Sequence, residues 1–290
     1  MTTGDGQQTS DDRSVNGTAS ANLAEAAVAI VKEPDLTAKT TLAKRTAKAW
    51  FTRQISLHGP GHKYSLPDTP GRPDKPELLP PRKMPKRSTA GERGRFALLH
   101  SLAHIELSAV DMTWDLIARF VSIGMPQLFY DNWVQVGLEE AKHFDLLRDR
   151  LGQLGGSYGD LPAHAGLWQA AQETKHDLLA RLAIVPLVLE ARGLDVGPEM
   201  IKKLEKAEDQ KSADILKIVY RDEKKHVAIG MYWFRFMCQR ESRPIEQTFQ
   251  TLVRKHFRSP IRPPFNEEAR LECGMPPTFY KPLTAFGAPS

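Results

Sequence analysis

One short pattern, Glu-x-x-His, occurs twice in this 290-residue chain and constrains its fold more than any other feature. The stretches Glu-Glu-Ala-Lys-His and Asp-Glu-Lys-Lys-His contain the pairs Glu140 with His143 and Glu223 with His226. Residues three apart on an α-helix lie on the same face, so a carboxylate and an imidazole in each pair can bind one metal ion. The pattern therefore predicts two helices that face a common site.

Two further glutamates stand upstream of these pairs. Glu106 precedes the first pair and Glu190 precedes the second, and each lies in its own apolar run with helical spacing. In one class of four-helix bundles, two helices each give a glutamate and two each give Glu-x-x-His to a dinuclear metal site. The order in this chain predicts an all-α fold built on such a bundle.

Burial separates this arrangement from a chance match. A single Glu-x-x-His is common on solvated helices, but here both pairs lie on apolar stripes. Glutamate is rarely buried without a partner, because removing a carboxylate from water costs several kcal/mol. Arginine or lysine could compensate, yet we identify neither on the stripes that face inward. Two divalent cations are the expected source of positive charge.

Each of the six residues has an expected role. Oxygen and imidazole ligands without a thiolate suit iron or manganese, so we expect two iron ions, with manganese as an alternative. The roles are two bridging carboxylates, one histidine for each metal and one terminal carboxylate for each metal: Glu140 and Glu223, His143 and His226, and Glu106 and Glu190 respectively.

An acidic residue stands directly before each pair. A metal-bound histidine usually donates its second N–H to a carboxylate or a carbonyl group. Asp222 is the better candidate for this supporting role and Glu139 the weaker one, while the alternative for each is a solvent-facing acid.

Three other side chains in the predicted helices carry groups that could take part in the site. Tyr220 lies three residues before Glu223 and could hydrogen-bond a ligand or carry a radical, although a core tyrosine is the simpler interpretation. His104 points away from Glu106, and His176 lies about 21 Å along the helix from Glu190 at ~1.5 Å per residue. We expect neither histidine to reach the metals.

The rest of the chain divides by composition. We expect a disordered tail, N-terminal helices, a proline-rich arm, the bundle and a C-terminal wrap: residues 1–20, 21–58, 59–91, 92–240 and 241–290. In the N-terminal helices, Trp50 and Phe51 are both expected to pack on the bundle.

Four long helices are predicted within the bundle: 92–123, 127–154, 167–192 and 211–240. Residues 193–198 should break the third helix before a short helical piece over 198–206, and Pro186 should kink it just before Glu190. The link over 155–165, with frayed ends, is roughly 15 residues and can span ~50 Å. It can therefore cross the bundle from end to end.

Composition argues for a cytoplasmic protein. The longest apolar run has eight residues, too few for a membrane span of about 20, and the N-terminus lacks a signal-peptide pattern. Residues 1–36 carry a net charge of −4 and the whole chain +5, so the remainder carries +9. A basic body leaves RNA open as a partner, although a solvated basic surface is the simpler interpretation.

Several stretches resemble a known family. Residues 21–285 resemble domain-of-unknown-function family 455 within the ferritin-like superfamily of di-iron carboxylate proteins. The resembling motifs are His104-Ile105-Glu106-Leu107, Glu139-Glu140-Ala141-Lys142-His143-Phe144, Leu189-Glu190-Ala191-Arg192-Gly193, Tyr220-Arg221-Asp222-Glu223 with His226, and Pro263-Pro264-Phe265-Asn266. The resemblance implies a ferritin-like fold with a long crossover connection and a di-iron centre, and it implies no particular reaction.

Three functions remain open at this point. The favoured one is an oxidoreductase that activates O₂ to hydroxylate or oxidise an unidentified substrate, with a separate electron donor. The second is iron oxidation, storage or other metal handling, and the third is a non-catalytic scaffold stapled by metals. By ligand order the nearest analogy is a ferritin-like hydroxylase of a modified tRNA base, so RNA is retained as a candidate substrate. A homodimer is retained as a candidate assembly.

Overall fold

The structure is a computed structural model that describes residues 22–58, 64–80, 83–84, 91–257 and 259–285. The predicted tail over residues 1–20 lies outside them. Within them the chain is mostly helical, as predicted. Its strands there are β1 (Leu78–Leu79) and β2 (Ala163–His164), which pair in parallel.

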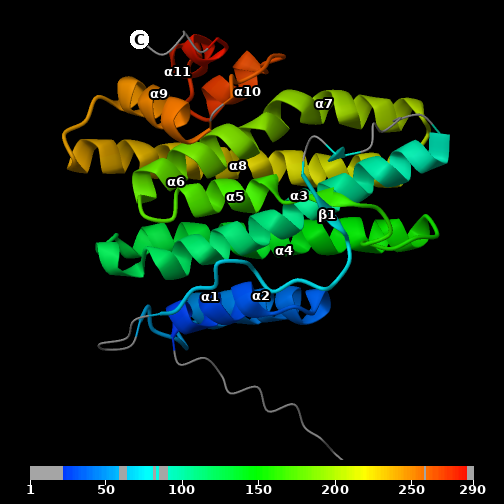
Figure 1. The fold of residues 1–290 in the computed structure, drawn as a ribbon, viewed down its shortest axis with the longest axis horizontal. Helices are drawn as coiled ribbons and strands as arrows, with labels where there is room; N and C mark the ends of the chain where they lie inside the picture. The colour runs from blue at the N-terminus through cyan, green and yellow to red at the C-terminus, as the bar shows by residue number, and fades with distance from the viewer. Residues whose placement is uncertain (1–21, 59–63, 81–82, 85–90, 258, 286–290) are drawn as a thin grey trace, which may run out of the picture.

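Four helical segments run side by side through the middle of the molecule (Figure 1). α3 packs along α4, and α8 packs against α4 and against every part of a composite segment. The four segments are α3 (Gly91–Arg119), α4 (Gln127–Gln153), α8 (Gln210–Arg240), and the composite of α6 (Leu178–Ile184), the π-helical η3 (Val185–Glu190) and α7 (Ala191–Lys206). The bounds of α3, α4 and α8 lie close to the predicted ranges.

The third predicted helix, over 167–192, is wrong as a single helix. A short helix, α5 (Gly166–Glu173), ends first, and α6 begins anew after Asp177. Asp177 caps α6, because its Oδ1 accepts a hydrogen bond from the backbone N–H of Ala180 at 3.1 Å. His176 lies exposed in the turn between α5 and α6, outside any helix.

The predicted break at 193–198 is also wrong, because α7 continues through it. Proline lacks an N–H, so Pro198 cannot make the usual helical bond to the carbonyl of Leu194. Asn266 Nδ2 donates to that carbonyl at 3.2 Å and replaces the missing bond. A residue from the C-terminal segment therefore supports α7 where the sequence alone predicts an end.

Two N-terminal helices cover one side of α3 and α4. α1 (Leu23–Lys32) packs on α3 and α2 (Leu36–Phe51) packs on α4. Trp50 is buried, and its Nε1 donates to Asp131 at 2.8 Å. Phe51 is 42% exposed, so the expectation that it also packs inward is wrong. Neighbouring residues on a helix point about 100° apart, so with Trp50 turned to the core Phe51 lies at the edge of the packed face.

The C-terminal segment covers the opposite side (Figure 1). α9 (Ile245–His256) packs on α6 and α8, α10 (Glu267–Glu272) packs on α7, and α11 (Pro277–Tyr280) packs on α9. Arg270 on α10 is buried and forms two hydrogen bonds to the carboxylate of Asp195 on α7, at 2.8 and 2.7 Å.

Buried basic side chains correct another expectation. Arg181 on α6 is fully buried and pairs with Asp115 at 2.7 Å, although the sequence suggested no arginine or lysine on the inward stripes. Lys39 is equally buried and pairs with Asp111. Within the described residues, neither base contacts the glutamates and histidines singled out by the sequence. Each base neutralises an aspartate elsewhere in the interior.

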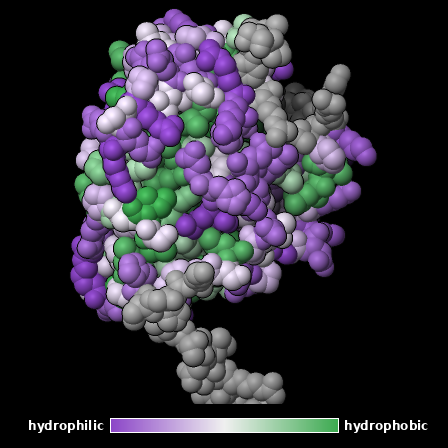
Figure 2. Space-filling model, turned by 60° about the vertical axis from the view of Figure 1, so that its left-hand side comes forward, coloured by the Kyte–Doolittle hydropathy of each residue, from purple (hydrophilic) through white to green (hydrophobic). Residues whose placement is uncertain are grey.

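A membrane span requires a helix that combines sufficient length with high hydropathy. None of the helices in the described ranges is at once long enough and apolar enough to cross a bilayer. On the face in Figure 2, hydrophobic residues form separate small patches among hydrophilic ones.

The π-helical segment lies very close to α8. A Cβ atom placed on Gly230 would be 2.4 Å from Cβ of Pro186, a distance that real side chains do not reach. Glycine at position 230 therefore lets α8 approach the segment that ends at Glu190.

This contact gives a matched pair of predictions. Gly230→Ala is expected to lower the free energy of unfolding by about 1–3 kcal/mol through overpacking. Gly152→Ala, at a helical position with no neighbour within 4 Å, is expected to raise it by about 0.5–1 kcal/mol. Urea denaturation measures both values. Equal stability of wild type and Gly230→Ala would contradict the close packing.

Candidate metal centre

The structure brings together the six residues singled out by the sequence. Glu140, His143 and His226 are fully buried, Glu106 and Glu223 nearly so, and Glu190 keeps some exposure. They come from four segments: Glu106 from α3, Glu140 and His143 from α4, Glu190 from the end of η3, and Glu223 and His226 from α8. We call them the six-residue cluster.

The cluster contains two overlapping groups of possible ligand atoms. In each group, one atom from every residue lies within 4.8 Å of the others. The first group is Glu106, Glu140, His143 and Glu223, and the second is Glu190, Glu223 and His226. Glu223 belongs to both groups, as a bridging carboxylate would.

Glu140 lies between the two histidines. Its Oε2 is 3.7 Å from His143 Nδ1, and its Oε1 is 3.0 Å from His226 Nδ1. Its carboxylate therefore contacts one member of each Glu-x-x-His pair. This placement suits the bridging role that the sequence suggests for Glu140.

The supporting acids contact the histidines in a crossed arrangement. His143 on α4 places Nε2 3.2 Å from Asp222 on α8, and His226 on α8 places Nε2 2.8 Å from Glu139 on α4. Each acid thus serves the histidine of the other motif. With Nε2–H donating to the acid, Nδ1 of a neutral histidine presents its lone pair to the cluster.

Three carboxylates of the cluster have raised pKa values. Burial and the charge of Glu140 raise the pKa of Glu106 to about 8. Burial and the charge of Glu223 raise the pKa of Glu190 well above its usual value, and burial also raises the pKa of Glu223. These three carboxylates favour protonation unless another positive charge is present.

The histidines and Glu140 shift in the opposite sense. Burial disfavours charged His143 and His226, but their carboxylate contacts outweigh burial and raise both pKa values well above the usual one. Burial raises the pKa of Glu140, but contacts with both histidines outweigh burial and lower this pKa overall. Protons on these residues partly neutralise the cluster. Divalent cations could take over this role, so metal binding would release protons.

The donor atoms fit a metal ion. Both carboxylate oxygens of Glu140 and of Glu190 are buried without a hydrogen bond of normal geometry among the described residues. An unpaired buried carboxylate is costly, and a cation compensates its charge directly. Carboxylate oxygens and imidazole nitrogens suit iron and manganese as well as other divalent metals. The cluster could therefore hold a metal ion.

The π-helical segment positions Glu190. A π-helical turn has i→i+5 bonding in place of the i→i+4 pattern, so it changes which side chains face inward. It begins beside Pro186, where the sequence predicts a disturbance, and ends at Glu190. Turns of this type occur frequently at functional sites.

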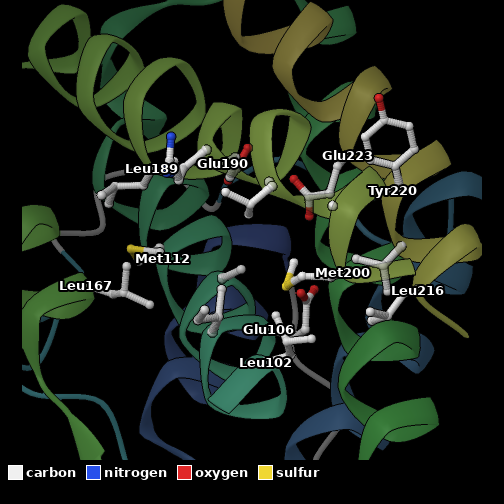
Figure 3. A pocket seen from close by; sticks show the side chains of 17 residues that line it. Leu102, Glu106, Met112, Leu167, Leu189, Glu190, Met200, Leu216, Tyr220 and Glu223 are labelled. Carbon is white, nitrogen blue, oxygen red and sulfur yellow. The ribbon is translucent and has the colours of Figure 1, made fainter. Parts of the chain in front are cut away.

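A cavity opens beside the cluster. Glu106, Glu190 and Glu223 line it, and Figure 3 shows their carboxylates among apolar side chains around the same space. The remaining lining comes mostly from apolar residues of α3, α7 and α8. The cavity places three carboxylates of the cluster within reach of a bound small molecule.

Tyr220 and His104 are not members of the six-residue cluster. Tyr220 lines the cavity, but its hydroxyl accepts a hydrogen bond from Asn266 Nδ2 at 3.2 Å, away from the cluster (Figure 3). His104 hydrogen-bonds the hydroxyl of Tyr158 and the carbonyl of His164, at 2.8 and 2.9 Å. Its expected separation from the cluster agrees with these contacts.

Sequence reasoning missed Lys142. Its Nζ donates to Asp222 Oδ2 at 2.6 Å, the oxygen that also contacts His143. Burial raises the pKa of Asp222, but hydrogen bonds from His143 and Lys142 outweigh burial and lower it overall. Lys142 lies between Glu140 and His143 in the first motif, where only the pairing of α4 with α8 reveals its partner.

The crossed arrangement makes a prediction about coupling. Asp222→Asn and Glu139→Gln should each weaken Mn(II) binding by about 10–100-fold, because each replaces the anionic acceptor that orients a histidine by a neutral amide. In double-mutant cycles, Asp222→Asn should couple to His143→Ala, and Glu139→Gln to His226→Ala. Titrations that follow the electron paramagnetic resonance signal of free Mn(II) measure these affinities. Stronger coupling within each motif than between motifs would contradict the crossed contacts.

Comparison with known proteins places the chain in a family. The model of the family described as "Protein of unknown function (DUF455)" matches residues 32–281. An uncharacterized protein of Haemophilus influenzae is 40% identical over 208 residues, which cover 70% of this chain and 72% of that protein. No solved structure matches the chain. The chain belongs to the family described as proteins of unknown function (DUF455).

Proposed function

We propose that this chain is a dinuclear non-haem iron protein with a ferritin-like four-helix bundle, and that it activates O₂ to hydroxylate or oxidise an organic substrate. Manganese is the alternative metal. One observation carries the proposal: an apolar cavity reaches a buried cluster of four glutamates and two histidines. A site for metal storage would not need an apolar chamber beside its carboxylates.

The order of donors supports the ferritin-like assignment. The segments α3, α4, η3 and α8 supply Glu, Glu-x-x-His, Glu and Glu-x-x-His in that order. This is the donor pattern of di-iron and di-manganese carboxylate bundles. The link between α4 and α6 contains the short helix α5 and the strand β2, which pairs with β1 from the segment before α3. In this proposal the link is the long crossover.

The cluster residues divide into bridging and terminal ligands. Glu223, which belongs to both groups, and Glu140, which contacts both histidines, would be the bridging ligands. His143 and Glu106 would complete the ligands of one metal, and His226 and Glu190 those of the other. Asp222 and Glu139 hold the histidine rings in orientation through Nε2.

The residues around the cluster suit a reaction from which bulk water is kept out. The chemistry supplied by two bound iron ions is the reduction of O₂, which protein side chains do not carry out alone. Apolar side chains in the cavity keep bulk water away from the carboxylates and position the organic group. Hydroxylation of a C–H bond consumes O₂, two electrons and two protons, and forms an alcohol and one water. The proposed function therefore requires an electron donor as a partner.

Removing a bridge tests the ligand roles. Glu140→Ala or Glu223→Ala should lose both metals, because each bridge serves both positions. Glu199→Ala, an exposed position on α7, should keep two metals per chain. Metal analysis after anaerobic Fe(II) loading and desalting gives the count. Two metals retained by the Glu140→Ala protein would contradict bridging.

The first test of function is an O₂ pulse on the Fe(II)-loaded chain. We expect two irons per chain, uptake of O₂ and a change in ultraviolet–visible absorbance as the iron is oxidised. Continued iron uptake well beyond two per chain would favour the metal-handling alternative. An absence of iron binding, or one redox-silent metal, would favour a scaffold and contradict the proposal.

A further inference from the structure

The cavity beside the cluster has a defined size. Its volume is about 150 Å³. An apolar cavity of about this volume accommodates a benzene-sized group. It can therefore enclose a ring or a chain of roughly six carbon atoms, and a larger substrate must keep the rest of its structure outside.

The lining selects an apolar group. Aside from the three carboxylates it consists largely of aliphatic and thioether side chains, including Leu102, Ala109, Met112, Leu189, Met200 and Leu216. Burying a polar group here without a hydrogen-bond partner would be unfavourable. Anionic groups would also meet three carboxylates at the inner end. The lining therefore favours an uncharged hydrocarbon portion.

Arg192 does not change this conclusion. It is the one basic residue of the lining, and its Nη1 donates to the carbonyls of Arg262 and Pro264 at 2.8 and 3.0 Å. The same nitrogen is 3.5 Å from Asp195. Arg192 thus serves to hold the C-terminal segment against α7.

Gly193 leaves space at the inner end of the cavity, beside Glu223. It lines the cavity, and a Cβ atom placed there would have Cγ of Glu223 as its nearest neighbour, at 3.9 Å. A methyl group fits at that distance, whereas a longer side chain would extend along Glu223 into the cavity. Gly197, one turn later, differs, because a Cβ there would come within 2.8 Å of the Tyr220 ring.

We propose that this cavity binds the uncharged, apolar end of a small organic substrate, of about six carbon atoms, and that Gly193 leaves the space for it beside Glu223. This inference rests on the proposed function, in which the enclosed group is the one that is oxidised. Its binding can be measured independently of turnover.

Linear alcohols from 1-butanol to 1-nonanol test the size of the cavity. Calorimetric titration of the Mn(II)-loaded full chain should show affinity rising about fourfold for each added methylene. The increase should level off near six carbons, when the cavity is full. With a second polar end, 1,6-hexanediol should bind at least about fivefold more weakly than 1-hexanol. Affinity that is independent of chain length, or equal for the diol, would overturn the proposal.

Variants at position 193 test the location. Gly193→Leu should weaken 1-hexanol binding by at least about tenfold, because its side chain replaces several methylene groups of the probe. Gly152→Leu provides the matched control, since that helical glycine is exposed with no neighbour within 4 Å, and should leave binding unchanged. Gly193→Ala is the milder variant and should lower hexanol affinity about fourfold while keeping the fold. Wild-type affinity in both position-193 variants would overturn the assignment of Gly193.

The same titration on the metal-free chain separates the two proposals. Length-dependent alcohol binding without iron binding or O₂ uptake would retain the cavity and overturn the proposed function. Two irons and O₂ uptake without alcohol binding would retain the function and overturn the apolar substrate.

Discussion

Four glutamates that share one apolar interior impose the main constraint on this molecule. Their mutual repulsion and the loss of water both oppose ionisation, so the pKa values of Glu106, Glu190 and Glu223 rise together. Two histidines offset only part of that charge. A hydrophobic core of the same volume would stabilise such a bundle at least as well, so an energetic cost of this size indicates a functional role.

The interior contains two kinds of buried charged group: ion pairs of opposite sign, and the six-residue cluster. Arg181 with Asp115 and Lys39 with Asp111 are buried pairs of opposite sign that need no further ion. The six-residue cluster has no such base within the described residues, although Lys142 contacts the supporting Asp222. Neutralised pairs thus lie among the helices, and an excess of carboxylates remains at the cavity.

The sequence predicts positions within one helix better than contacts between helices. The three-residue spacing of Glu140 with His143 and of Glu223 with His226 places each pair on one face whatever surrounds it. The crossed contacts of Asp222 and Glu139 depend on how α4 and α8 are rotated against each other, which no local pattern specifies. The sequence does not predict the break before α6, because aspartate also occurs within helices and Asp177 alone does not identify an N-cap. The continuity of α7 was missed because the bond that replaces the one lost at Pro198 comes from Asn266, far along the chain.

That replacement also orders the events of biosynthesis. A ribosome makes all six cluster residues before it reaches Asn266 and Arg270, whose side chains bind Leu194 and Asp195 on α7. The helix that carries Gly193 and one wall of the cavity therefore gains its last hydrogen bonds only when this late segment emerges and folds back. The donors can assemble on the nascent chain first, and the chamber beside them is completed afterwards.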